Sequence, residues 1–146
     1  MMRFVNFESK CYPSSLPRRH ALLVDEDGKD LKYFTMLLLR SGYAVKSFLN
    51  YPEAEGCLEH EDFDFVILNQ GGPVFEAHRL VALVLARNRN TPVVVVTRCL
   101  EMKSYLEAMQ LGAADYLEKP VTPAEFERTV MMHCQPRQGE ISAQAS

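Results

Sequence analysis

The chain has 146 residues, a net charge of −3 at pH 7, 47% hydrophobic residues and 24% charged residues. This composition is normal for a globular domain with one substantial core, and an acidic chain is a poor direct partner for nucleic acid. The apolar runs are too short to cross a membrane, and the start of the chain has no unbroken apolar run of signal-peptide length. We therefore expect a cytoplasmic protein that contacts neither nucleic acid nor membrane directly.

The cysteines and histidines give no sign of a metal site. The cysteines are scattered, without a C-x-x-C pair, at Cys11, Cys57, Cys99 and Cys134. The histidines are equally dispersed. This spacing is poor for zinc and is typical of unpaired thiols in a reducing compartment.

Strands and helices are predicted to alternate along one domain. The domain spans 20–134, between an N-terminal extension at 1–19, which we expect to be partly disordered, and a flexible C-terminal tail at 135–146. The predicted elements are, in chain order, strand 21–24, a helix that begins after Asp27, strand 43–48, helix 52–60, strand 64–69, helix 75–88, strand 93–97, helix 101–111, strand 115–118, and a helix from 123 to about 134.

Local signals support these boundaries. Asp27 can cap the first helix, and Thr122 begins a capping box. Gly42 and Gly112 supply left-handed helix stops. Runs such as the four valines at 93–96 are typical of strands buried on both faces. Five such strands alternating with five helices indicate an α/β fold, with a single doubly wound five-stranded parallel sheet and helices on both of its faces.

Polar residues stand at the carboxyl ends of three of these strands. The first strand runs into the acidic stretch 25–27, the third ends at Asn69, and the fourth ends at Thr97. Open α/β sheets place their ligand chemistry at this edge. If the strands are parallel neighbours, one pocket collects carboxylates, an amide and a hydroxyl.

Four segments of the chain form a recognisable pattern. They are L-L-V-D-E-D at 22–27, D-F-V-I-L at 64–68 with Pro73 four residues past Asn69, V-V-V-V-T at 93–97, and G-A-A-D-Y-L-E-K-P at 112–120. Together they resemble a receiver domain of two-component response regulators, and the match covers roughly 20–134 in order and at suitable spacing. The resemblance implies a flavodoxin-like sheet with the strand order 2-1-3-4-5.

The resemblance also implies roles for five residues at the strand ends. Asp25 and Glu26, with the backbone carbonyl of Gly71, would hold Mg²⁺. The hydroxyl of Thr97 and the ammonium group of Lys119 would contact the phosphoryl group. The peptide bond after Lys119 is typically cis in this family.

The phosphoacceptor position of the family falls on Asn69, and there the likeness breaks. The family's reaction is attack on phosphorus by a carboxylate oxygen, whereas a carboxamide oxygen has no formal charge and is a poor nucleophile. The change also removes an anionic ligand from the metal site, so Mg²⁺ binding is weakened or lost and is not required. We therefore expect no ordinary aspartyl phosphorylation, no catalytic residue and no enzymatic activity.

Other positions leave alternatives open. Thr97 and Tyr116 correspond to the pair that changes conformation on activation in the family, but either side chain could be purely structural. Lys119 could bridge to Asp25 or to the Asn69 oxygen and lock one fixed state, or it could form a surface ion pair.

Arg98 occupies a position where most receivers have a small residue. Its guanidinium group could reach Asp25 or Glu26, or point to solvent. On the next helix, an apolar stripe is predicted to be core rather than partner surface: Met102, Leu106 and Met109.

These observations favour a degenerate receiver that acts as a regulatory protein-interaction module in phosphorelay signalling. By family likeness, the surface from the fourth helix through the fifth strand to the last helix would bind a protein partner or a second copy, with a histidine kinase as one candidate. The alternative is a receiver that still accepts a phosphoryl group, through another residue or after deamidation of Asn69.

Overall fold

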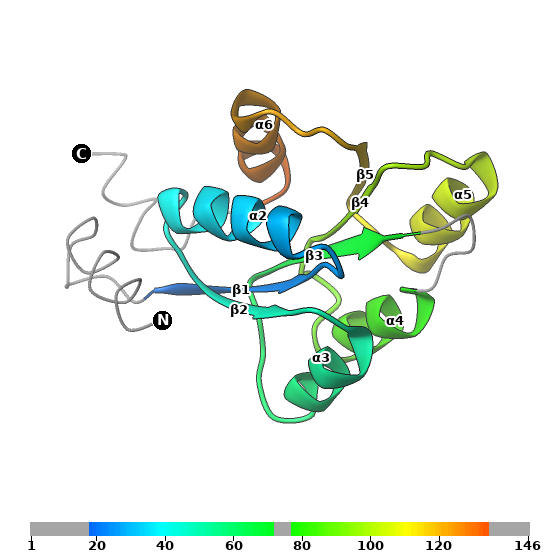
Figure 1. The fold of residues 1–146 in the computed structure, drawn as a ribbon. Coiled ribbons are helices and arrows are strands. Elements are labelled where there is room, and N and C mark those ends of the chain that lie inside the picture. The colour runs from blue at the N-terminus through cyan, green and yellow to red at the C-terminus, as the bar shows by residue number, and fades with distance from the viewer. Residues whose placement is uncertain (1–17, 72–76, 135–146) are drawn as a thin grey trace.

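The computed structural model describes residues 18–71 and 77–134, and in them five strands alternate with five helices (Figure 1). The strands are β1 (Arg19–Val24), β2 (Tyr43–Phe48), β3 (Phe65–Gln70), β4 (Val93–Thr97) and β5 (Asp115–Glu118). The helices are α2 (Gly28–Arg40), α3 (Tyr51–Leu58), α4 (His78–Arg87), α5 (Met102–Leu111) and α6 (Pro123–His133). Every strand pair is parallel and the order is β2-β1-β3-β4-β5, which confirms the predicted sheet.

The predicted capping residues begin and end helices as expected. The Asp27 carboxylate accepts hydrogen bonds from the amides of Lys29 and Asp30, at 2.8 and 3.3 Å, and so satisfies two amides that have no partner within α2. At the carboxyl end of α5, Gly112 has a φ of +111°. A β-carbon there would also lie 2.9 Å from Leu85 Cδ1, so glycine is required both by the backbone and by the packing.

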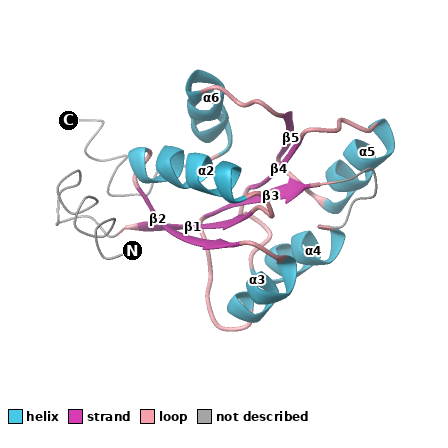
Figure 2. Ribbon diagram, viewed as in Figure 1, coloured by secondary structure: helices cyan, strands magenta, loops and turns pink. Residues whose placement is uncertain are grey.

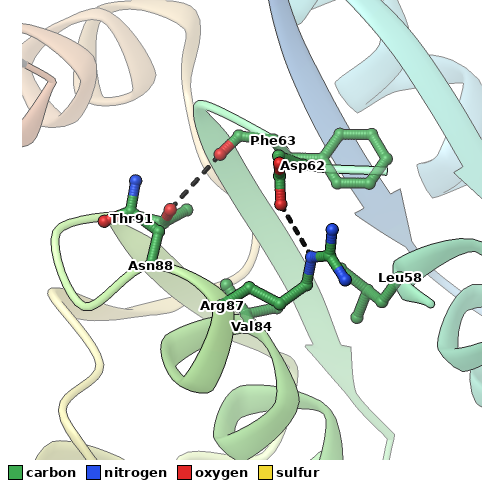
Figure 3. Close-up of a pocket in the computed structure, with 7 residues that line it drawn as sticks. All are labelled: Leu58, Asp62, Phe63, Val84, Arg87, Asn88 and Thr91. Carbon is green, nitrogen blue, oxygen red and sulfur yellow. Dashed lines mark hydrogen bonds and ion pairs between the residues drawn. The ribbon is translucent and has the colours of Figure 1, made fainter. Parts of the chain in front are cut away.

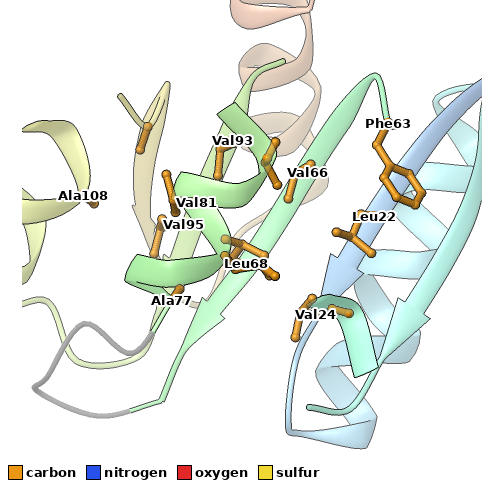
Figure 4. Packing of buried hydrophobic residues seen from close by; sticks show 14 of the residues in the cluster. Leu22, Val24, Phe63, Val66, Leu68, Ala77, Val81, Val93, Val95 and Ala108 are labelled. Carbon is orange, nitrogen blue, oxygen red and sulfur yellow. The ribbon is translucent and has the colours of Figure 1, made fainter. Parts of the chain in front are cut away.

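The helices cover both faces of the sheet (Figure 2): α2 and α6 lie on one side, and α3, α4 and α5 lie on the other. Each face buries its own apolar cluster. Phe34 and Phe126 belong to the cluster under α2 and α6, while Leu68 and Val81 belong to the cluster under the other three helices (Figure 4). β3 is central and buried along its whole length, so its carboxyl end is fixed by packing on both sides.

One sequence prediction about α5 is wrong. Met102 and Leu106, predicted as core, are 69% and 48% exposed, and only Met109 of that stripe packs against the core. The buried side of the helix is formed instead by Ser104 and Ala108. These side chains are small and let the helix approach the sheet edge closely, which turns the larger apolar side chains outward.

β3 also runs one residue further than predicted, through Gln70. β1 begins at Arg19, the last residue of the predicted extension. The other expectations for that extension, those for the C-terminal tail and those for the first residues of the third predicted helix fall on 1–17, 135–146 and 72–76, outside the described residues. None of the helices in the described ranges has the length and apolar character that a membrane span requires.

Candidate functional site

The parallel strands bring the predicted site residues to one edge of the sheet. Asn69 pairs in register with Val96, and the next pair joins Gln70 to Thr97. The amide of Lys119 donates to the carbonyl of Thr97 at 2.7 Å, so the end of β5 is held beside the end of β4. The peptide bond from Lys119 to Pro120 is cis, as the resemblance implied.

A buried ion-pair cluster forms around Lys119. Its ammonium nitrogen lies 2.9 Å from Asp25 Oδ2 and 2.8 Å from Asp30 Oδ2. The side chains of Lys119 and Asp25 are 4% and 0% exposed, and that of Asp30 is 19% exposed. The ammonium group also lies 5.9 Å from the centroid of the Phe34 ring, within the range of a cation–π attraction. Lys119 therefore bridges to Asp25, one of the two partners considered from the sequence.

Arg98 joins the same cluster from its solvent side. Its Nη2 lies 2.5 Å from Asp30 Oδ2 and 3.7 Å from Asp27 Oδ2. The residues considered from the sequence were Asp25 and Glu26, and the target lies instead on the first turn of α2. Hydrogen bonds from two backbone amides lower the pKa of Asp27, and Arg98 contributes further to this shift. Arg98 is 62% exposed, so it covers the cluster without being buried.

Asn69 is only 8% exposed and lies beside two of the three residues expected to hold a metal, Glu26 and Gly71. Its backbone carbonyl accepts a hydrogen bond from the hydroxyl of Tyr51. A β-carbon on Gly71 would lie 3.2 Å from Glu26 Oε1 and 3.7 Å from Asn69 Nδ2, which places these three residues together. The sequence prediction that an amide and a carboxylate meet at this strand edge is confirmed. The predicted third member, the Thr97 hydroxyl, lies instead with Gln70 on the opposite face of the sheet, because Thr97 pairs in register with Gln70 and not with Asn69.

The donor set fits Mg²⁺ poorly. Both oxygens of Asp25 are already engaged: Oδ2 by Lys119, and Oδ1 by the amide of Asp27 at 3.0 Å. Glu26 is the other carboxylate, Gly71 offers a carbonyl, and Asn69 adds no charge. Within 18–71 and 77–134, no three His, Cys, Asp or Glu side chains are grouped as a metal site would need. Hard divalent cations are held mainly by anionic oxygens, and here one free carboxylate remains.

Thr97 and Tyr116 form a second cluster on the opposite face of the sheet. The Thr97 hydroxyl donates to the carbonyl of Gln70 at 2.9 Å and accepts from the amide of Cys99 at 3.0 Å. The Tyr116 hydroxyl donates to Oε1 of the Gln70 side chain at 3.3 Å. Burial raises the pKa of Tyr116 above its usual value. Both residues of the expected switch pair are therefore tied to one residue of β3.

Gln70 is the residue that sequence reasoning missed. It is 1% exposed and follows Asn69 in the strand, so the two side chains point to opposite faces of the sheet. A signal was available, because a polar side chain continued a fully buried strand. The strand predicted from the sequence ends at Asn69, which leaves Gln70 outside the predicted buried residues.

A small cavity at the other end of the sheet is unconnected with this site (Figure 3). The ion pair from Arg87 Nε to Asp62 Oδ1, at 2.7 Å, joins two of the residues that line it. Its lining residues lie at the amino ends of the strands and on α3 and α4: Leu58, Asp62, Phe63, Val84, Arg87, Asn88 and Thr91. Ligand chemistry in open α/β sheets lies at the other edge.

The fold and site define a doubly wound α/β domain with an acidic pocket at the carboxyl edge of its sheet. Residues 21–131 match the response regulator receiver domain, and the chain therefore belongs to this family. Receiver domains are signalling modules of two-component systems, and this chain is one of them.

Two curated relatives come from Pseudomonas aeruginosa. The chain is 30% identical over 117 residues to the alginate biosynthesis transcriptional regulatory protein AlgB, covering 80% of this chain and 26% of AlgB. It is 29% identical over 106 residues to the response regulator protein PilR, covering 73% of this chain and 24% of PilR. The chain thus spans about a quarter of the length of each relative.

Solved structures show the same fold. A CheY-like receiver domain protein from Methanospirillum hungatei JF-1 superposes with a TM-score of 0.72 at 22% identity, over 80% of this chain and 93% of that one. The chemotaxis protein CheY4 from Vibrio cholerae superposes with a TM-score of 0.71 at 23% identity, over 80% and 99%.

Proposed function

We propose that this receiver domain signals without phosphoryl transfer, as a regulatory protein-interaction module. The observation that carries the proposal is the carboxamide of Asn69, which stands in the buried pocket where the family's acceptor carboxylate would be. The amide oxygen is neutral and is a poor donor of an electron pair to phosphorus, whereas the reaction needs an activated nucleophile. The domain is then neither an enzyme nor dependent on Mg²⁺.

The charge cluster supports the same proposal. In the family pattern, Lys119 is the cation that pairs with the phosphoryl group, and here it already contacts Asp25 and Asp30. Two carboxylates satisfy a buried ammonium group well. A lysine held in this way keeps one arrangement of the strand ends in the absence of any added anion. We place this role in the cytoplasm, in keeping with the unpaired thiols of Cys57, Cys99 and Cys134.

The partner surface we propose lies on α5. Four apolar residues at its start are 37–69% exposed and form what we name the α5 patch: Leu100, Met102, Tyr105 and Leu106. Tyr105 contacts Tyr116 edge to face, with ring centroids 5.6 Å apart, so the patch touches the buried switch residue. Exposed apolar clusters of this kind often mark protein-binding surfaces. A second copy of the chain and a histidine kinase are the two occupants to test.

Incubation of the native chain with acetyl phosphate and Mg²⁺ is expected to leave its mass unchanged. The reason is that the Asn69 carboxamide cannot displace acetate from phosphorus. Intact mass spectrometry at acidic pH, where an acyl phosphate survives, is the measurement. A full-yield gain of one phosphoryl group that is lost in alkali would overturn the proposal. Peptide mapping would then separate acceptance by another residue from acceptance by deamidated Asn69.

The control for that experiment is Asn69→Asp under the same conditions. It restores a carboxylate, and phosphoryl gain by this variant alone would assign the difference to the acceptor atom.

Leu106→Glu is expected to weaken self-association of the chain by about tenfold or more, because it places a charge within the apolar α5 patch. Sedimentation velocity over a concentration series measures the effect. Met36→Glu is the matched control, since Met36 is 43% exposed on α2, away from the patch. Both variants should keep the free energy of unfolding within about 0.5 kcal/mol of native.

Association that is equally strong in Leu106→Glu and native protein would contradict the α5 patch as the interface. If the native chain stays monomeric at every concentration, the second copy is excluded. The same pair of variants is then compared for binding to a histidine kinase.

A further inference from the structure

We infer that Asp30 is a built-in counter-anion, which takes the electrostatic place of a phosphoryl group by holding Lys119 and Arg98 on one carboxylate oxygen. This inference rests on the proposed function and extends it. It assigns to one residue of α2 the task of keeping the site in a single state. Asp30 acts through Lys119 and is therefore a positioning residue.

Asp30 holds two cations at once. Its Oδ2 lies 2.8 Å from Lys119 Nζ and 2.5 Å from Arg98 Nη2. Two cations from the ends of two different strands thus converge on a single oxygen. Charge-assisted hydrogen bonds of this length are the strong ones, and low exposure on the Lys119 side limits screening by water.

The charges of the cluster around Asp30 balance. Asp25 and Asp30 contribute two negative charges, and Lys119 and Arg98 contribute two positive charges, so the cluster is neutral as it stands. Glu26 and Asp27 nearby add only negative charge. An incoming anion would meet a Lys119 that two carboxylates already hold, so Asp30 makes the pocket a poorer site for phosphoryl groups than Asp25 alone would.

Asp30 is held in place by the start of α2. It lies in the first turn of α2, whose start is fixed by the Asp27 cap. One turn later, Phe34 is 2% exposed and packs into the core, so the helix cannot easily shift. Through Arg98, Asp30 also anchors the segment between β4 and α5, which leads directly into the α5 patch. The same contact therefore ties the pocket to the proposed partner surface.

The test uses the Asn69→Asp background, in which an acceptor carboxylate is present. With acetyl phosphate and Mg²⁺, the introduced carboxylate oxygen attacks phosphorus, the bond from phosphorus to the acetyl oxygen breaks, and acetate leaves. The rate of phosphoryl gain, followed by intact mass, is compared between Asn69→Asp and Asn69→Asp/Asp30→Asn. Removing the Asp30 charge leaves Asp25 as the one carboxylate partner of Lys119, so the lysine can pair with the incoming group, and we expect a rate about tenfold or more higher.

Two further variants in the same background separate this role from others. Asn69→Asp/Asp62→Asn removes one negative charge at the far end of the sheet and should leave the rate unchanged. Asn69→Asp/Arg98→Gln leaves Lys119 held by Asp30 and should react no faster than Asn69→Asp alone.

Equal rates in Asn69→Asp and Asn69→Asp/Asp30→Asn would overturn the inference, as would a failure of both to react. A gain in rate with Arg98→Gln but not with Asp30→Asn would assign the obstruction to Arg98 instead. Far-ultraviolet circular dichroism of each variant reports whether it is folded, and Asp30→Ser replaces Asp30→Asn if the latter is not. Phosphoryl gain by the native chain is a separate outcome, which overturns the proposed function and not the role of Asp30.

Discussion

Lys119→Met is expected to lower the free energy of unfolding by about 3–5 kcal/mol, because removing one partner of a buried ion pair leaves the other charge uncompensated. Asp25 is fully buried and would lose the cation 2.9 Å from its Oδ2, while Asp30 would keep only the exposed Arg98. Methionine fills a similar volume, so the loss reports charge rather than a cavity. Urea unfolding at neutral pH, followed by circular dichroism, measures it.

The matched control is the same change at an exposed lysine. Lys46 pairs with Glu61, and the two side chains are 52% and 41% exposed. Surface pairs contribute about 0–1 kcal/mol, so Lys46→Met should remain close to native stability. A loss at Lys119 as small as that at Lys46 would mean that Asp25 and Asp30 are solvated well enough to stand alone. The cluster could not then hold the strand ends in place.

The sheet could be predicted because each strand carries its own signal. The valine run of β4 is apolar at every position, and parallel strands buried on both faces need that composition. Glycine at 112 marks the end of α5 because a left-handed φ is costly for other residues. Once the strands are parallel neighbours, Asp25, Asn69 and Thr97 must meet at one edge. The chain order thus gives the edge at which these residues meet, but not the face: the register places Thr97 with Gln70, on the face opposite Asn69.

The pairings inside the pocket could not be predicted in the same way. Asp30 reads as an ordinary acidic residue in the first turn of a helix, where it complements the helix dipole. Only the approach of β5 to α2 reveals that its carboxylate faces Lys119. For α5, helical spacing identified an apolar stripe but could not say that Ser104 and Ala108 face the sheet. Spacing gives the faces of a helix, and tertiary packing chooses between them.

Gln70→Leu is expected to lower the free energy of unfolding by about 1–3 kcal/mol, because it leaves the hydroxyl of buried Tyr116 without its acceptor. Leucine is close to glutamine in size, so the effect reports the lost hydrogen bond rather than a cavity.

The comparison variant is Tyr116→Phe, which removes the hydroxyl itself and should lose about 0.5–1.5 kcal/mol. Urea unfolding of both, and of the double variant, completes a double-mutant cycle. The coupling between the two residues should be about 0.5 kcal/mol or more, and additive losses would mean that the bond does not hold Tyr116.

The burial of Tyr116 also predicts a pH dependence of stability. Burial raises the pKa of Tyr116 in the folded chain, whereas a tyrosine in the unfolded chain has its usual pKa of about 10. The unfolded state therefore loses its proton first, and the contribution of Tyr116 to stability is full below about pH 10 and declines as the pH rises through the folded pKa. Tyr116→Phe should make the unfolding free energy less steep in this range, relative to the native chain. An unchanged slope would place the Tyr116 hydroxyl in water, where Gln70 could not fix the switch residue against Tyr105 and the α5 patch.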